Sequence, residues 1–256
     1  MRAAHCAVTM GQSVNCAMSD VQFTPTALAR KLGTFMLLSA AEQRKLTELQ
    51  IPMQSVKRGK QLIREGEADR EAFVLQAGWA CSYKDLPSGS RQIISFPIAG
   101  DFIGLRSVLL KTADHSFETL TDSIVSSIDG VGMLQTFSEY PRLGAAILWA
   151  ASRDEAMVVE HLVNIGRRNS IERTAHFFIE LVERMLLVGL SNETRFECPL
   201  TQKVLADALG LTAIHVNRVL KQLRELNLIT MQHGSVIIHD LPRLRKLSGF
   251  QGGYLH

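Results

Sequence analysis

The chain has 256 residues, which is enough for two domains of ordinary size. Hydrophobic residues make up 46% of it and charged residues 21%, and no run of about 18 or more apolar residues occurs, so we expect a globular protein that does not span or bind a membrane. The net charge is +3, and the segment from Gly166 to the end has 12 Lys and Arg against 8 Asp and Glu. The rest of the chain has 16 against 17, so the positive excess lies in the C-terminal part, as expected for a segment that binds phosphates.

Residues 1–20 are mostly small or polar and show no periodicity, which predicts a disordered tail without a secretory signal. The cysteines are too few and too widely spaced for a disulfide framework, which fits a cytoplasmic protein. They are Cys6, Cys16, Cys81 and Cys198.

Residues 39–129 predict one helix followed by short strands. Ser39 and Glu42 have the spacing of a capping box before an amphipathic segment that ends at Leu49. Short apolar or alternating segments follow, separated by glycines, at residues 54–56, 61–64, 72–84, 91–96 and 117–129. Many short strands with regular turns are typical of a jelly-roll sandwich or barrel.

Residues 138–165 predict a single helix about 42 Å long. It has two adjacent apolar stripes, whereas one stripe suffices to cover the helix's own domain, so the second indicates a homodimer interface. A helix buried in one large core is the alternative. Residues 166–169 should end the helix, and Ser170 is expected to cap the next one, which ends at Leu187.

Residues 200–239 predict a helix, a turn, a second helix and a β-hairpin. The first helix covers 200–208, Gly210 can take the positive φ of a tight turn, and Thr212 can cap a second helix over 213–226. Strands at 228–231 and 236–239 would form a wing. Buried positions that lock two such helices together are occupied by Leu205, Ala206, Leu209, Leu211, Val216 and Val219.

The exposed face of the second helix has side chains that can read a major groove. An arginine can pair with guanine through two hydrogen bonds and an asparagine with adenine, so we predict base contacts from Ile214, His215, Asn217 and Arg218. Phosphate contacts are predicted from Thr201, Gln202, Lys203, Thr212, Lys221 and His233. A three-helix core that does not bind DNA is the alternative.

Three groups of motifs carry a resemblance to one family. Residues 205–220, LADALGLTAIHVNRVL, resemble the DNA-reading unit of Crp/Fnr regulators. Residues 166–173, GRRNSIER, look like the segment that joins the family's dimerisation helix to its DNA-binding domain. Residues 64–67 and 96–104 look like its effector-domain loops, so that the resemblance covers about residues 30–247.

The resemblance implies an α+β fold with three functional parts after the tail. These are a cyclic-nucleotide-binding-like jelly roll at 21–137, a dimerisation helix at 138–168 and a winged helix-turn-helix domain at 169–256. It implies a homodimer that binds double-stranded DNA and RNA polymerase. Where the family's best-known members place a glutamate on a base, this chain has Ile214, so their operator sequences do not carry over.

The resemblance also places a possible effector pocket at Gly104, Leu105, Arg106, His115 and Ser116. The family's cyclic-nucleotide binders have a glutamate after the glycine and an arginine before the serine or threonine. Leu105 and His115 replace them, so we do not expect cyclic AMP to bind. The effector stays unknown; a different ligand and a purely structural His115 are both open.

Cysteine and histidine spacing bears on the remaining alternatives. Cys6 and Cys16 have no third neighbour, so no iron–sulfur cluster is expected. Haem ligation by His5, Cys6 or Cys81 and a histidine without a function in the tail are both open. Cys198, next to Pro199, is a candidate redox thiol, with an inert thiol as the alternative. A jelly-roll oxygenase needs clustered histidines, and no such pair or other catalytic motif occurs, so we expect neither a metal site nor an enzyme. A small-molecule or redox sensor that acts without DNA is the functional alternative.

Overall fold

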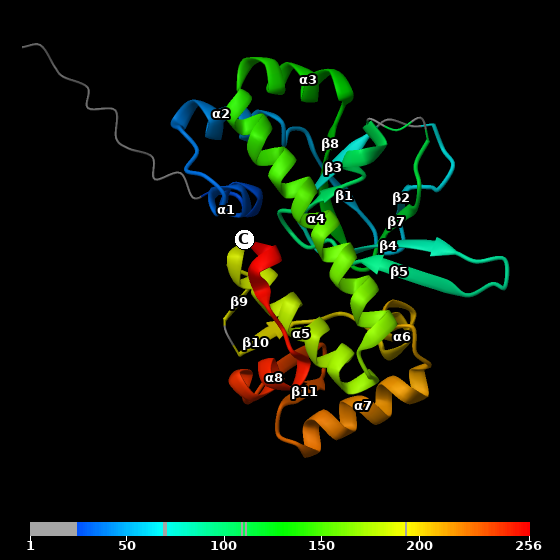
Figure 1. Ribbon diagram of the computed structural model, residues 1–256. Helices are drawn as coiled ribbons and strands as arrows, with labels where there is room; N and C mark the ends of the chain where they lie inside the picture. Colours follow the sequence, from blue (N-terminus) through cyan, green and yellow to red (C-terminus); the bar gives the residue numbers. More distant parts are fainter. Residues whose placement is uncertain (1–24, 69–70, 109, 111, 193) are drawn as a thin grey trace, which may run out of the picture.

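The computed structural model describes residues 25–68, 71–108, 110, 112–192 and 194–256 (Figure 1). The predicted tail, with Cys6 and Cys16, lies outside the described residues. A β domain, a long helix and a C-terminal helical domain with a small sheet follow one another along the chain, which confirms the expected α+β architecture. None of the helices described is long and apolar enough to cross a membrane.

The β domain consists of two four-stranded antiparallel sheets with the orders β1-β8-β3-β6 and β2-β7-β4-β5. The strands are β1 (Met53–Val56), β2 (Gln61–Ile63), β3 (Ala72–Ala77), β4 (Ala80–Asp85), β5 (Arg91–Ser95), β6 (Phe102–Ile103), β7 (Ser116–Thr119) and β8 (Ser123–Ile128). Their inward side chains form a core that includes Ile63, Leu75, Ile103 and Phe117. Gly78, at φ +95°, divides the predicted segment 72–84 into β3 and β4.

Three short helices accompany this domain: α1 (Ala27–Gly33), α2 (Ala40–Glu48) and α3 (Gly130–Glu139), with a 3₁₀ turn η1 (Leu105–Val108) between β6 and β7. The capping box predicted for α2 is present. The Ser39 N–H donates to Glu42 Oε2 over 2.6 Å, and the Glu42 N–H donates to Ser39 Oγ over 3.3 Å.

The long helix α4 runs from Pro141 to Arg167 and not from 138 to 165. Tyr140, with φ −130° and ψ 68°, separates it from α3. A proline cannot donate the backbone hydrogen bond that would continue α3, and it disfavours helical geometry in the residue before it, so a new helix starts at Pro141. Gly166, expected to end the helix, lies inside its last turn. α4 extends from α3 down to α5 and α6 (Figure 1).

Helix α5 covers Ser170–Leu187 as predicted, but Ser170 is not its N-cap. Asn169 Oδ1 accepts from the N–H groups of Ile171 and Glu172, and the Glu172 carboxylate accepts from the Asn169 N–H. Asparagine and serine are comparable caps, and here the break of α4 leaves Asn169 in the extended conformation that a cap needs.

The C-terminal part contains α6 (Gln202–Leu209), α7 (Ala213–Glu225), α8 (Leu241–Ser248), a terminal 3₁₀ turn η2 (Gly252–Leu255) and a sheet. The sheet has four strands in the order β11-β12-β10-β9, so the predicted two-stranded wing is half of it. The strands are β9 (Ser191–Asn192), β10 (Arg195–Glu197), β11 (Ile229–Gln232) and β12 (Ser235–Ile238). The arrangement is the predicted winged helix-turn-helix.

Candidate DNA-binding surface

Helices α6 and α7 form the helix-turn-helix unit. Gly210 ends α6 in the left-handed region, at φ 62° and ψ 40°, where glycine has no steric penalty. Thr212 caps α7 by accepting from the His215 N–H over 3.2 Å. The side chains predicted to lock the helices together, Leu205, Ala206, Leu209, Val216 and Val219, are buried, and Leu211 packs against them.

The outward face of α7 lies at the edge of the molecule farthest from α3 (Figure 1). Ile214 is 77% exposed there, although it is a large apolar residue. Arg218 is exposed and has no hydrogen bond or ion pair within the part of the chain that the structure describes. Asn217 is exposed as well, and its Nδ2 donates to Gln202 Oε1 at the start of α6 over 3.2 Å.

His215 differs from the other three predicted base contacts. It is half-buried, and its Nε2 lies 3.1 Å from Ser170 Oγ at the start of α5. The ring therefore points back toward α5 and not outward with Ile214 and Arg218.

The predicted phosphate contacts lie at two helix starts, on α7 and on the wing. Thr201 and Thr212 use their hydroxyls as helix caps. Phosphate binding at these positions would therefore rely on the backbone N–H groups in the first turns of α6 and α7. Lys203 is exposed, and Lys221 lies 3.7 Å from Glu225 on the same surface. His233 occupies the tip of the wing at φ 50°.

At the predicted effector pocket, Ile63 covers Gly104. A Cβ at Gly104 would lie 2.0 Å from Ile63 Cδ1, so Ile63 occupies the space in front of this backbone. The His115 ring is buried with its centroid 4.6 Å from that of Phe117, and burial lowers its pKa despite Asp114 at 2.7 Å. These contacts favour the structural interpretation of His115.

The polar groups nearest this position are also engaged within the protein. Ser116 Oγ accepts from the Glu65 N–H over 3.0 Å, and Arg106 lies 3.1 Å from Asp114. Leu105 is partly buried against the core that contains Val74 and Phe102.

The candidate redox thiol is not placed for reaction. Cys198 is 1% exposed, and burial raises its pKa to about 11. A thiol that is buried and protonated at neutral pH reacts slowly with oxidants, because the thiolate is the nucleophile. Cys81 is similar, with a pKa raised to about 12 by burial and by the charge of Glu118.

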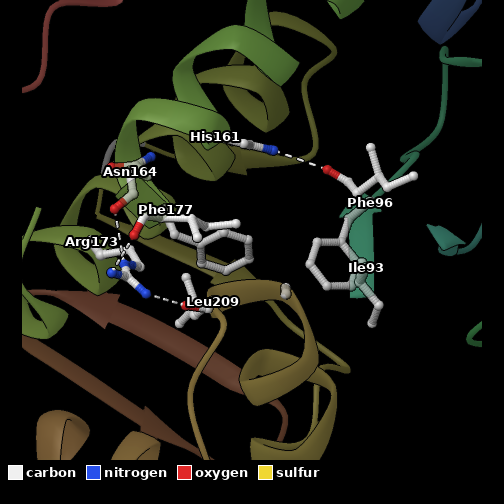
Figure 2. Close-up of a pocket in the computed structure, with 10 residues that line it drawn as sticks. Ile93, Phe96, His161, Asn164, Arg173, Phe177 and Leu209 are labelled. Atoms are coloured by element: carbon white, nitrogen blue, oxygen red, sulfur yellow. Dashed lines mark hydrogen bonds between the residues drawn. The ribbon is translucent and has the colours of Figure 1, made fainter. Parts of the chain in front are cut away.

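The structure reveals a junction that the sequence did not indicate. A cavity of about 20 Å³ lies between β5, α4, α5 and α6, too small for an organic effector (Figure 2). His161, Asn164 and Arg173 contribute its polar lining. The sequence assigned Arg173 only to a joining segment, because its partners lie in elements that only the fold brings together.

Comparison with known proteins identifies the two halves. Residues 53–140 match the model of the cyclic nucleotide-binding domain, and residues 172–247 match that of the Crp-like helix-turn-helix domain. The nitrogen fixation regulation protein FixK of Bradyrhizobium diazoefficiens is 30% identical over 166 residues, which cover 65% of this chain and 69% of FixK.

Two further matches extend over more of the chain. The electron transport regulator A of Shewanella oneidensis is 26% identical over 221 residues, 85% of this chain and 88% of that protein. The solved structure of FixK2 from Bradyrhizobium japonicum has a TM-score of 0.70 at 22% identity and covers 78% of this chain and 98% of FixK2. The chain therefore belongs to the Crp/Fnr family of DNA-binding transcription regulators.

Proposed function

We propose that two copies of this chain pair along α4 and place their α7 helices in successive major grooves of a near-palindromic DNA site. The observation that carries the proposal is the outward face of α7, where Arg218 has no partner in the described part of the chain. An unpaired arginine at this point of a helix-turn-helix is suited to form two hydrogen bonds with a guanine.

The exposed face of α4 supports the pairing. Leu148 is 65% exposed, Val159 57% and Leu162 71%, and they repeat at the spacing of a coiled-coil seam. The other seam positions are Ala145, Ser152 and the exposed Glu155. Burial of these exposed apolar side chains against a second copy of the chain would be favourable.

We assign the predicted contact residues separate roles. Arg218 and Asn217 read bases, and Ile214 contributes an apolar contact of the kind that a thymine methyl group accepts. His215, held by Ser170, positions α7 and does not read a base. Phosphates are contacted by the side chains of Gln202, Lys203, Lys221 and His233, and by the backbone N–H groups at the starts of the helices that Thr201 and Thr212 cap.

The proposal extends to three further points. Cyclic AMP is not the effector, because Leu105 and His115 stand where an anion site needs polar anchors and Ile63 lies against Gly104. RNA polymerase is the partner through which bound regulator changes transcription. The protein acts in the cytoplasm, where its DNA is.

The test is DNA binding by Arg218→Ala to a site selected from random duplexes with the wild-type protein. We expect a loss of about 1–3 kcal/mol per half-site and a relaxed preference at one base pair in each half. Lys221→Ala is the control on the same helix. It should weaken binding to every sequence similarly and reduce the dependence on salt by about one ion per protomer, or about two for the dimer. If Arg218→Ala weakened all sequences equally, its role as a base contact would be refuted.

A further inference from the structure

Two side chains from outside α6 hold the C-terminal end of that helix. Gln92 of β5 donates from Nε2 to the Ala208 carbonyl over 3.2 Å, and Arg173 of α5 donates from Nη1 to the Leu209 carbonyl over 2.5 Å. Figure 2 shows Arg173 beside Leu209. Gly210 and the start of α7 follow directly, so these two carbonyls fix where the recognition helix begins.

The same guanidinium also binds the end of α4. Its Nε donates to the Asn164 carbonyl over 3.0 Å, and its Nη2 donates to the carbonyls of Ile165 over 2.8 Å and Arg168 over 3.1 Å. Carbonyls in the last turn of a helix have no N–H partner within the helix. The planar fork of an arginine can satisfy several of them at once, so one side chain joins the ends of α4 and α6.

No carboxylate lies within ion-pair distance of Arg173 among the described residues. Arg173 is half-buried, and this burial lowers its pKa. The negative ends of two helix dipoles provide the compensation instead. If α4 and α6 separated, the guanidinium would lose its hydrogen bonds to one of the two helix ends. Leaving a half-buried charged donor unpaired costs free energy, so the separation is unfavourable.

We propose that Arg173 is the positioning residue that holds the α6–α7 pair at a fixed distance and angle from the dimerisation helix, with Gln92 securing the same helix end to the effector domain. This inference rests on the proposed function, since it concerns two half-sites read by one dimer. Movement of the end of α4 then displaces α6, the turn at Gly210 and α7 together. The spacing of the two recognition helices follows from the rigidity of this link.

The test is the dependence of DNA affinity on the distance between half-sites. The selected operator is compared with versions whose spacer is longer or shorter by one base pair, which shifts the half-sites by about 3.4 Å. The wild type should lose affinity sharply in both directions. Arg173→Lys keeps the charge, but one ammonium cannot bind both helix ends, so we expect several-fold weaker discrimination between spacers. Affinity for an isolated half-site should stay within about twofold.

Arg168→Lys is the matched control in the same segment. Arg168 Nη1 donates to Glu160 Oε2 over 3.0 Å and to Asn164 Oδ1 over 2.8 Å, both on α4, so its replacement should leave the spacer profile unchanged. A merely structural role for Arg173 would lower thermal stability without changing the ratio of affinities between spacers.

The possible outcomes separate the two proposals. Failure of the wild-type dimer to bind duplex DNA, or to prefer any spacer, would refute the proposed function. A wild-type preference that Arg173→Lys retains in full would overturn the inference. Should Arg173→Lys not fold, Gln92→Ala removes the second contact from a half-buried surface side chain. It should weaken spacer discrimination in the same direction, and an unchanged profile would overturn the inference equally.

Discussion

His161 of α4 lies between two hydrogen-bond acceptors. Its Nδ1 is 3.0 Å from the Ile94 carbonyl of β5, and its Nε2 is 2.9 Å from Glu180 Oε1 of α5. A neutral imidazole has one N–H, so both bonds are satisfied together only by the protonated ring next to an ionised carboxylate. Burial favours the neutral ring, but the charge and the hydrogen bond of Glu180 outweigh it, and the pKa of His161 is raised.

The carboxylate is stabilised in turn. Burial alone would raise the pKa of Glu180, yet His161, Arg184 and the Tyr254 hydroxyl at 2.8 Å hold it at about 2. The protonated His161 ring of α4 therefore donates both to β5 of the effector domain and to α5.

This proton makes stability depend on pH in a defined direction. Because the folded pKa of His161 lies above the unfolded value of about 6.5, its contribution is full below about pH 6.5 and is lost as the pH rises through the folded value. Burial lowers the pKa of His176 to about 4 and also lowers that of His115. These two groups therefore affect stability only below about pH 6.5, where acidification makes them favour unfolding.

We therefore expect the free energy of unfolding of the wild type to fall, as the pH rises above about 6.5, by more than that of His161→Gln. Urea denaturation followed by circular dichroism at each pH measures both curves. Other groups that titrate in this range, such as the cysteines, are present in both proteins. Their contributions cancel when the two free-energy curves are subtracted. Parallel curves would show that His161 is not protonated in the folded state.

At the scale of elements, the start of α5 is held by a capping box. Asn169 Oδ1 accepts from two N–H groups, and Glu172 completes the capping box. Asn169→Ala should lower the free energy of unfolding by about 1 kcal/mol, since a cap residue is typically worth that much. Ser170→Ala, the neighbouring control, removes only one hydrogen bond with His215 and should cost less. Thermal or chemical denaturation decides, and a larger loss in Ser170→Ala would assign the cap to Ser170.

The helices show which parts of the fold were predictable from sequence. The caps Ser39 and Thr212 and the turn at Gly210 were found because their signals are local and lie next to the elements that they end. The break between α3 and α4 was missed, although Pro141 marks it, because the apolar pattern continues across it. Strands β9 and β10, of two and three residues, are too short to carry an alternating pattern.

The outward residues of α7 could likewise be predicted, because helical periodicity shows which side chains face away from the buried ones. The inward turn of His215 and the role of Arg173 could not. Their partners, Ser170 and Leu209, are 45 and 36 positions away in sequence, and only the packed junction brings them together.

At the scale of the whole molecule, one of three hydrophobic clusters in the described residues crosses from the β domain into the winged domain. A single core cluster extends from Trp79, Ile93 and Phe96 of the β domain through Phe178 of α5 to Val216 of α7. A buried set of charges crosses the same boundary, since Asp101 binds both Lys31 of α1 and Arg184 of α5 at 2.8 Å. The sequence boundary at 168/169 is therefore a break between helices and not a break in packing.

The C-terminal end strengthens this connection. The chain returns from α8 to the middle of the molecule (Figure 1), where Arg153 of α4 donates from Nε to the Leu255 carbonyl over 2.9 Å. An open cleft of about 1010 Å³ separates the domains on another side, between the turn at Gly78 and the wing around His233. The winged domain is thus joined to the rest at α5, α6 and its C-terminus and is separated from it at the wing.

Dimerisation through α4 can be distinguished from DNA contact through α7 by one pair of substitutions. Leu162→Asp would place two carboxylates in an apolar seam, where the cost of desolvating them should prevent pairing. We expect a monomer by native mass spectrometry and sedimentation at micromolar concentration, with specific DNA affinity reduced to that of one half-site. Ile214→Asp changes a similarly exposed apolar residue on α7. It should remain a dimer and lose DNA binding through repulsion from the phosphates. A Leu162→Asp protein that stayed dimeric would move the interface away from α4, and with it the geometry that aligns the two recognition helices.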